Sequence, residues 1–240
     1  MRSSRQDASV PSQTPPDMAT SHATTVLGLK FRDGVIVAGD RRAVEGFSIA
    51  DEKMEKVFPA DDLSAIAISG AAGQAIEVVR LFQTELEHYE KVTGDRLSLD
   101  GKANRLAQMI RENFPMAIQG LVVVPLFGGY DERAEIGRIF RYDATGGRWE
   151  DEDYHATGSG GRAAKGTLKK RWRPDMSRED AMTAAVEALA DASEEDVGTG
   201  GPSLIRGIFP TICVITASGV DEPDEQELRS IVEGVIGENA

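Results

Sequence analysis

The sequence has little sulfur and little imidazole. Cys213 is the single cysteine among 240 residues, so no disulfide can form within the chain. We expect Cys213 to be a small buried hydrophobe, and we expect the reducing cytoplasm as the compartment. The histidines His22, His88 and His155 are far apart, and no two of them have the spacing of metal ligands. The sequence therefore predicts no metal, no cofactor and no Cys/His nucleophile pair.

Long apolar runs and net positive charge are also absent. No apolar run approaches the roughly 20 residues that a membrane helix needs, so we expect no membrane partner. The formal net charge is −13, and an acidic surface repels phosphate backbones, so we expect no nucleic-acid partner. With 40% hydrophobic and 28% charged residues, the composition is typical of a globular protein with one large domain or two small ones.

Residues 1–23 differ in composition from the rest of the chain. They are rich in Ser, Pro, Thr and Gln and show no apolar periodicity, so they cannot bury enough surface to fold. They also lack the apolar centre of a secretory signal. Composition leaves three alternatives for this segment: a tail, a leader added for expression, or a propeptide.

From Thr24 onward, groups of apolar strands alternate with pairs of amphipathic helices. The predicted strands are 24–31, 35–39, 56–58, 63–69, 121–127, 136–142, 149–157 and 208–216. The predicted helices cover 75–89, 100–114, the residues after 161, 181–193 and 225–236. Asp100 and Ser177 are the predicted caps of two of these helices. Helices grouped between sets of strands predict an α+β fold with two sheets covered by helical layers.

Thr24 begins the first predicted strand and directly follows the unusual segment. A threonine hydroxyl is a poor nucleophile until a base takes its proton. If the chain were cut after Ala23, the new α-amine of Thr24 could be that base, because its reference pKa of about 7.7–8.0 lies near working pH. While Ala23 is attached, the nitrogen is an amide and not a base. Since threonine opens many strands, an ordinary strand start remains the alternative for Thr24 alone.

Several short motifs lie along the chain. The first part contains Thr24-Thr25-Val26, Ala38-Gly39-Asp40-Arg41-Arg42, Lys56-Val57 and Ser69-Gly70-Ala71-Ala72-Gly73. The later part contains Gly158-Ser159-Gly160 and Asp196-Val197-Gly198-Thr199-Gly200-Gly201. Together they resemble the site motifs of proteasome β-subunits, over nearly all of residues 24–240. Three further segments resemble the actinobacterial type most: Glu87-His88-Tyr89-Glu90, Gly128-Gly129-Tyr130-Asp131 and Gly207-Ile208-Phe209-Pro210-Thr211.

The resemblance implies catalytic roles for four residues. Thr24 would be the nucleophile, and Lys56 would lie beside its hydroxyl and lower the pKa of that hydroxyl. Asp40 would hold Lys56 charged and oriented. Gly70 would present its backbone N–H to the oxyanion, at a helix start whose dipole adds favourable charge. From the residues alone, Asp40 and Lys56 also fit a surface ion pair, and Gly70 fits a glycine needed for backbone freedom.

The resemblance also implies a supporting network around the Thr24 amine, formed by Ser159, Asp196 and Thr199. Thr199 departs from the serine that is usual in the family, but it keeps a hydroxyl donor and acceptor. Ser159 taken alone also suggests a serine hydrolase, although Gly-Ser-Gly lacks the wider Gly-x-Ser-x-Gly pattern.

An apolar specificity pocket is a further implication. Its predicted lining is Ala43, Val44, Met54, Phe58, Ile68, Ala72 and Ile76. None of these residues carries charge, so we expect cleavage after large apolar residues. Val44 stands where the family usually has threonine, at a position that acts mainly through backbone hydrogen bonds to an extended peptide. Phe58 and Ile76 fit plain core residues equally well.

These expectations combine into a threonine endopeptidase made as a precursor. Residues 1–23 would be a propeptide. Residues 24–240 would be a catalytic domain with the four-layer αββα sandwich of N-terminal nucleophile hydrolases, in which two antiparallel sheets lie between helical layers. The chain would cleave itself between Ala23 and Thr24. The choice of Thr24 over Thr25 as first residue rests mainly on the motif alignment.

The resemblance implies partners as well. It implies a barrel of four seven-membered rings, with two inner rings of β-subunits, including copies of this chain, and two outer rings of α-subunits. A hexameric ATPase regulator would feed unfolded proteins into the barrel. Tagging of those substrates by a prokaryotic ubiquitin-like protein is compatible with this interpretation. Active sites inside a closed chamber would let an unselective peptidase exist in the cytoplasm.

Three alternatives stay open at this point. An N-terminal-nucleophile amidohydrolase for small amides would use the same chemistry without rings. A bacterial two-ring relative of the proteasome is nearer, but its mature chain is shorter than this one. A catalytically silent structural β-subunit is the third, although the motifs retain Thr24, Asp40, Lys56 and Asp196.

Overall fold

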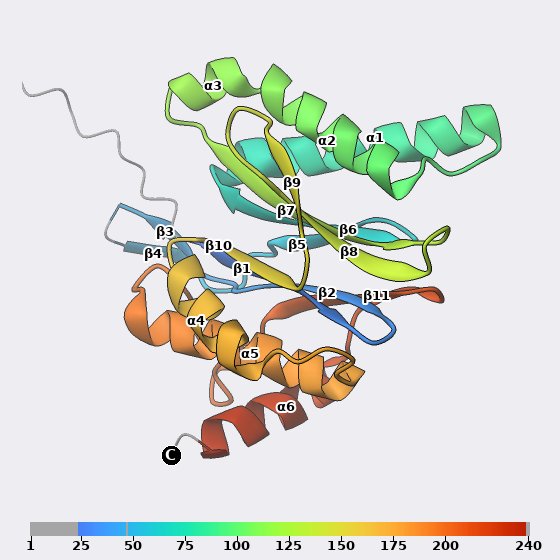
Figure 1. Ribbon diagram of the computed structural model, residues 1–240. Helices are drawn as coiled ribbons and strands as arrows, with labels where there is room; N and C mark the ends of the chain where they lie inside the picture. The colour runs from blue at the N-terminus through green and yellow to red at the C-terminus, as the bar shows by residue number, and fades with distance from the viewer. Residues whose placement is uncertain (1–23, 47, 239–240) are drawn as a thin grey trace, which may run out of the picture.

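The computed structural model describes residues 24–46 and 48–238 and contains two five-stranded antiparallel sheets (Figure 1). The first has the order β10-β1-β2-β11-β12, with β1 Thr25–Phe31, β2 Gly34–Gly39, β10 Tyr154–Gly158, β11 Thr211–Thr216 and β12 Gly219–Asp221. The second has the order β5-β6-β7-β8-β9, with β5 Val57–Asp61, β6 Ser64–Gly70, β7 Val123–Asp131, β8 Ile136–Tyr142 and β9 Arg148–Asp151. A hairpin that the sequence did not predict pairs β3 Ala43–Glu45 with β4 Ser48–Asp51. The helices are α1 Ala72–Thr93, α2 Leu99–Glu112, α3 Phe114–Ile118, α4 Gly161–Arg171, α5 Arg178–Glu195 and α6 Glu225–Glu238.

Three clusters of buried side chains hold these elements together as four layers. One cluster joins the first sheet to α4, α5 and α6, and a second joins the second sheet to α1 and α2. The third fills the space between the two sheets. Figure 1 shows the same arrangement, with α1 to α3 above the sheets and α4 to α6 below them. The order helix, sheet, sheet, helix confirms the predicted α+β fold and its αββα sandwich.

Strand β2 shows why the central strands are continuous apolar runs in the sequence. Successive side chains of a strand point to opposite faces of its sheet. Ile36 and Ala38 belong to the cluster beneath the first sheet, whereas Val35 and Val37 belong to the cluster between the sheets. Because both faces of β2 are buried, the strand has no polar alternation.

The predicted strand 149–157 is wrong, because the structure divides it into two strands in different sheets. β9 pairs with β8, and β10 pairs with β1. The chain bends at Glu152 and Asp153 to pass from one sheet to the other. An apolar pattern gives the faces of a strand but not its neighbours, so it does not reveal where a chain changes sheets.

Two predictions about helix α2 are also corrected. Its N-cap is Ser98, and Asp100 lies inside the first turn. Phe114 belongs to the separate short helix α3, since Pro115 lacks the N–H that would continue the hydrogen bonding of α2. In α5, Ser177 is the N-cap, as predicted.

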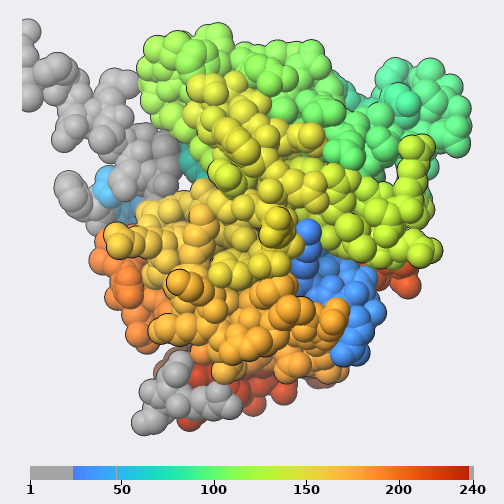
Figure 2. All heavy atoms as spheres, viewed as in Figure 1, coloured from blue at the N-terminus to red at the C-terminus, as the bar shows by residue number. Residues whose placement is uncertain are grey.

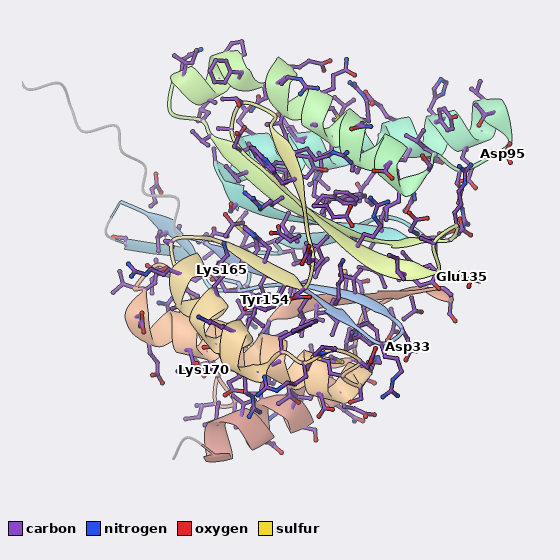
Figure 3. The ribbon with its side chains drawn as sticks, in the orientation of Figure 1. Asp33, Asp95, Glu135, Tyr154, Lys165 and Lys170 are labelled. Atoms are coloured by element: carbon purple, nitrogen blue, oxygen red, sulfur yellow. The ribbon has the colours of Figure 1, made fainter. Side chains whose placement is uncertain are left out.

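The candidate residues gather at the open end of the β1–β2 hairpin, where β1 starts and β2 ends. The turn of the hairpin, at Asp33, lies at the opposite end of the molecule, with the turn at Glu135 and the loop at Asp95 (Figure 3). The start of β1 and the end of β2 lie side by side, because Val26 pairs with Gly39. β10 pairs with β1 on its other side, so the end of β10 also lies beside the start of β1. Figure 2 shows β10 and the helices α4 and α5 beside one another on the face in view. Residues just outside these strand ends therefore meet.

Candidate active site

Asp40 is the centre of the site and follows directly after β2. One carboxylate oxygen, Oδ1, accepts the Thr25 N–H at 2.8 Å and the Lys56 ammonium at 2.7 Å. The other oxygen, Oδ2, accepts the backbone N–H groups of Arg42 at 2.9 Å and Gly200 at 2.8 Å. The residue is fully buried. Four donors from four separate places in the chain thus fix the position of this carboxylate and offset the free-energy cost of burying its charge.

Lys56 lies immediately before β5, and its side chain crosses to the first sheet. Its Nζ donates to Asp40 and also to the backbone carbonyl of Arg42 at 2.5 Å. Burial lowers the pKa of the Lys56 ammonium below its ordinary value; the Arg42 charge adds to this effect, and the Asp40 carboxylate opposes it. The ion pair of Lys56 and Asp40 is buried, which excludes the surface ion pair that the sequence left open.

A second group of polar residues surrounds the backbone nitrogen of Thr24. The Thr24 N–H donates to Ser159 Oγ at 3.3 Å, and Ser159 N–H donates to the Thr24 carbonyl at 2.9 Å. The hydroxyls of Ser159 and Thr199 both donate to Asp196 Oδ2 at 2.5 Å. These contacts arise because β10 pairs with β1, which places the turn after β10 beside Thr24. The structure therefore brings together the three residues predicted to support Thr24.

The pKa of Asp196 reflects its position in this group. Burial raises the pKa of its carboxyl, but the hydrogen bonds from Ser159, Thr199 and the Gly198 N–H outweigh burial, helped by the Lys56 charge. The pKa therefore lies below its usual range, and Asp196 is a carboxylate at neutral pH.

Gly70 ends β6 and turns the chain into α1. Its φ is +108°, and an added Cβ would lie 2.1 Å from the carbonyl oxygen of Val122, so only glycine fits here. The next N–H, that of Ala71, donates to the same carbonyl at 2.8 Å. No side chain caps the N-terminus of α1, and its first turn has no acidic residue, so the positive end of the helix dipole is not neutralised locally.

A small cavity of about 40 Å³ joins Thr24, Lys56 and Gly70. Five predicted pocket residues line it as well: Ala43, Val44, Met54, Ile68 and Ala72. Phe58 and Ile76 do not line it, and both are packed against the cluster between the second sheet and α1. Ser69 and Ala75 line the cavity and were not predicted.

Two further residues of the site, Arg42 and Thr25, were not predicted from the sequence, because their roles depend on backbone atoms or on contacts between distant parts of the chain. Arg42 accepts Lys56 with its carbonyl, donates to Asp40 with its N–H, and donates from its guanidinium to the Val197 carbonyl at 3.0 Å. Thr25 is fully buried and contacts both Asp40 and Thr199. The Arg41-Arg42 motif was visible in the sequence, but nothing in it indicates that Arg42 acts through its backbone.

A larger hollow of about 700 Å³ lies away from these residues. It is formed by the β5–β6 turn, α1 and the β11–β12 turn, and its lining includes Glu87, Glu90, Glu132 and Glu222. It contains none of the candidate residues. Across the described ranges, 24–46 and 48–238, no helix is both long and apolar enough to cross a membrane, and no three His, Cys, Asp or Glu residues form a metal site.

Comparison with known proteins agrees with the motifs. Residues 20–205 match the model of the proteasome subunit family. A protein of Acidimicrobium ferrooxidans named proteasome subunit beta is 53% identical over 225 residues, which are 94% of this chain and 80% of that protein. A protein of the same name from Streptomyces griseus is 54% identical over 215 residues, which are 90% of this chain and 76% of that protein. The chain therefore belongs to the proteasome subunit family, as a β-subunit of the bacterial kind.

Proposed function

We propose that this β-subunit is a threonine endopeptidase whose nucleophile is Thr24 Oγ, exposed with a free α-amine when residues 1–23 are removed. A proteasome β-subunit is a peptidase, and the proposal concerns which residues do the chemistry. The observation that carries it is the shared cavity of Thr24, Lys56 and Gly70, together with the 3.3 Å contact of the Thr24 nitrogen with Ser159 Oγ.

The contacts of Ser159 favour the α-amine of Thr24 as the general base. Ser159 donates its single hydroxyl proton to Asp196, so its oxygen can only accept from the Thr24 nitrogen. After cleavage, an N–H of the amine would keep this contact, and the amine lone pair would stay free for the Thr24 hydroxyl proton. The ordinary pKa of an α-amine, about 7.7–8.0, suits a base at neutral pH.

Lys56 and Gly70 supply charge stabilisation. Lys56 has three N–H bonds and gives two of them to Asp40 and the Arg42 carbonyl, so the third can face the cavity beside Thr24. A cation at that place lowers the pKa of the attacking hydroxyl. Because the Ala71 N–H is occupied by Val122, the Gly70 N–H is the better donor to the oxyanion at this turn.

The reaction follows from these roles. Thr24 Oγ attacks the carbonyl carbon of the scissile bond while its proton passes to the α-amine, and the amine then gives that proton to the leaving nitrogen. The resulting ester on Thr24 is hydrolysed by water, with the amine as base again. In the precursor the Thr24 nitrogen is an amide and cannot be the base, so self-cleavage would begin with an acyl shift. Thr24 Oγ attacks the carbonyl carbon of Ala23, the bond from that carbon to the Thr24 nitrogen breaks, and the hydroxyl proton ends on this nitrogen, which becomes the α-amine. Hydrolysis of the resulting ester by water would release residues 1–23 as a propeptide and leave 24–240 as the catalytic domain.

The contacts of Thr25 favour Thr24 as the nucleophile. The Thr25 hydroxyl lies 2.7 Å from Thr199 Oγ and accepts the Gly160 N–H at 3.0 Å, and the residue is fully buried. A hydroxyl so engaged is not available to a substrate, whereas Thr24 lines the cavity.

The lining of the cavity supports a preference for apolar residues before the cut. Ala43, Val44, Ile68 and Ala72 provide apolar walls. The volume of about 40 Å³ is small for a large side chain, but Met54 is partly exposed and flexible, so its movement would enlarge the cavity.

As a proteasome β-subunit, the chain assembles with α-subunits into a core particle. We further propose that it forms the two inner seven-membered rings of a four-ring cytoplasmic barrel. A hexameric ATPase would deliver unfolded proteins, including those tagged by a prokaryotic ubiquitin-like protein. A closed chamber would keep folded proteins away from an active site that selects its substrates by little more than their apolar side chains.

Co-expression with the α-subunit tests the proposal. The intact mass and amino-terminal sequence of the assembled β-subunit report whether it begins at Thr24, and a peptide with a large apolar residue before a fluorogenic amine reports activity. We expect Thr24→Ala to keep residues 1–23 and to lose activity to background, with Thr145→Ala in an exposed turn as the matched control. Activity in Thr24→Ala would refute the nucleophile, and removal of residues 1–23 at the same bond in that variant would refute self-cleavage. A wild-type chain that stays uncut after assembly would favour a structural subunit.

A further inference from the structure

The side chain of Thr25 lies between the two polar groups of the site. Its backbone N–H donates to Asp40 Oδ1 at 2.8 Å, and its carbonyl accepts the Asp40 N–H at 3.0 Å. Its hydroxyl oxygen accepts the Gly160 N–H at 3.0 Å and lies 2.7 Å from Thr199 Oγ. The residue is fully buried, so water cannot replace any of these contacts.

The direction of the hydrogen bond between Thr25 and Thr199 follows from the neighbouring contact. Thr199 gives its single hydroxyl proton to Asp196 Oδ2 at 2.5 Å. The Thr25 hydroxyl must therefore be the donor to Thr199, while it accepts from Gly160. A side chain at this position thus has to donate and accept at one atom, which a hydroxyl does and an alkyl group cannot.

Both contacts of the Thr25 hydroxyl act on the surroundings of Ser159, whose Oγ accepts from the Thr24 nitrogen. Gly160 directly follows Ser159, so its N–H fixes the turn that aims Ser159 Oγ at Thr24. The bond to Thr199 fixes the rotamer with which Thr199 and Ser159 share one oxygen of Asp196. On the other side, the backbone of Thr25 is bound to Asp40, the partner of Lys56.

We propose that Thr25 is a positioning residue, whose hydroxyl aligns Ser159, Asp196 and Thr199 at the Thr24 amine and so sets the rate of acyl transfer. This inference rests on the proposed function of Thr24. Thr25 does not touch the reacting atoms, so its hydroxyl affects the rate through the alignment of the amine and leaves the substrate cavity, which Thr25 does not line, unchanged.

The test compares Thr25→Val, which keeps the shape without the hydroxyl, with Thr25→Ser, which keeps the hydroxyl. Each is co-expressed with the α-subunit, and intact mass gives the fraction of chains that begin at Thr24. The matched control is Thr167→Val, because Thr167 is also a buried threonine with a donating hydroxyl; its acceptor is the Asp191 carboxylate, between α4 and α5. Kinetics are measured on mature chains across pH, with the same fluorogenic peptide.

We expect Thr25→Val to lower kcat by about tenfold or more, because one buried N–H and one hydroxyl lose their partner and small misalignments of a base are costly. KM should change less than about twofold, and the pH midpoint of the acidic limb should move, since the surroundings of the amine change. Thr25→Ser should recover kcat to within about threefold of the wild type. Thr167→Val should leave kcat and KM unchanged.

The proposal is overturned if Thr25→Val retains the kcat and the pH profile of the wild type, or if Thr25→Ser loses as much activity as Thr25→Val. If Thr25→Val does not mature, Thr25→Cys decides, because a thiol keeps the volume but is a weak donor and acceptor; equal kcat for Thr25→Cys and Thr25→Ser would overturn the role of the hydroxyl. Thr24→Ala separates the two hypotheses. Activity in Thr24→Ala refutes the proposed function, whereas an inactive Thr24→Ala beside a fully active Thr25→Val refutes this inference alone.

Discussion

The Nζ atom of Lys56 lies 2.7 Å from Oδ1 of Asp40, and the two side chains are 2% and 0% exposed to solvent. A buried ion pair rarely gives the most stable protein. Removing two charges from water costs free energy, and an apolar pair of similar size in the same place avoids this cost. This fold retains the pair and adds two backbone N–H groups on the other carboxylate oxygen. The arrangement is best explained by the charge that Lys56 brings to the cavity of Thr24.

Asp40→Asn tests how strongly the pair supports both stability and rate. The amide NH₂ cannot accept a hydrogen bond, so one pair of donors loses its acceptor: either the Lys56 ammonium and the Thr25 N–H, or the backbone N–H groups of Arg42 and Gly200. We expect the free energy of unfolding to fall by about 3–5 kcal/mol and kcat/KM to fall by about 100-fold or more. Denaturant unfolding of the subunit and peptide hydrolysis measure the two effects.

The control for this variant is Asp62→Asn, which breaks an ion pair with Arg96 in which the Asp62 side chain is 75% exposed. An exposed pair contributes about 0–1 kcal/mol, so this change should be nearly neutral. Equal stability losses in the two variants would contradict the assignment of a special role to the buried pair.

The lowered pKa of Lys56 predicts an alkaline limit of activity. Burial is the main cause of the shift, so Lys56 loses its proton below the ordinary lysine value of about 10.5. We expect kcat/KM to decline on the alkaline side at a pH below that value, because the cation beside Thr24 disappears. A pH–rate profile measures this decline, and a constant rate up to pH of about 10.5 would contradict it.

The same shift affects stability with the opposite sign. Between the folded pKa and the unfolded value of about 10.5, the unfolded chain binds the proton more strongly, so the contribution of Lys56 to stability rises as pH rises through this window. Lys56→Met removes the group. The wild type should therefore gain stability relative to Lys56→Met with rising pH, as measured by denaturant unfolding at a series of pH values.

Gly70→Ala tests the oxyanion donor. The φ of +108° is unfavourable for alanine, and its Cβ would lie 2.1 Å from the Val122 carbonyl oxygen, so the turn must shift. We expect a loss of about 1–3 kcal/mol of stability and of about 100- to 1000-fold in kcat as the N–H moves.

Gly73→Ala, three residues further along, is the matched control. An added Cβ meets no atom within 4 Å there, and Gly73 does not line the cavity. It should stabilise α1 by about 0.5–1 kcal/mol and leave hydrolysis unchanged. The oxyanion role would be wrong if Gly70→Ala lowered stability but kept kcat.

The sequence predicted contacts within one hairpin, but it did not predict contacts between the two sheets or contacts made by backbone atoms. The Asp33-Gly34 turn between two apolar strands predicts a hairpin, and that hairpin brings Asp40 next to Thr25. The partner of Asp40 could not be found in this way, because Lys56 reaches it from the second sheet, and only the resemblance to a family indicated the pair. The backbone carbonyl of Arg42 could not be found at all, because every residue has a carbonyl.

The predicted lining of the cavity shows a related limit. Phe58 and Ile76 are apolar and lie near residues that line it, yet both side chains belong to the cluster beneath α1. Composition and period state that a side chain is turned away from water. They do not state which of two apolar surroundings it enters, and that distinction here depends on how β5 and α1 pack.

The thiol of Cys213 provides a test of the layer between the two sheets. Cys213 lies fully buried on β11 in the cluster that separates the sheets. Burial, with smaller effects of the Glu222 and Glu55 charges, raises the pKa of its thiol to about 12 from an ordinary value of about 9.

Because the pKa of the Cys213 thiol is higher in the folded protein than in the unfolded chain, the folded protein keeps this proton at a pH at which the unfolded chain loses it. Stability is therefore lost as pH rises from 9 toward 12. At pH 10 the loss attributable to one thiol is about 1–2 kcal/mol. Cys213→Ala lacks this thiol but keeps Tyr142, whose pKa burial also raises, so the difference in unfolding free energy between the two proteins reports the thiol alone. We expect that difference to change by this amount between pH 8 and pH 10, and we expect the native thiol to react with iodoacetamide at pH 8 at least about 100-fold more slowly than the unfolded one. Rapid alkylation of the native chain, or no change of the difference with pH, would mean that water reaches the space between the sheets.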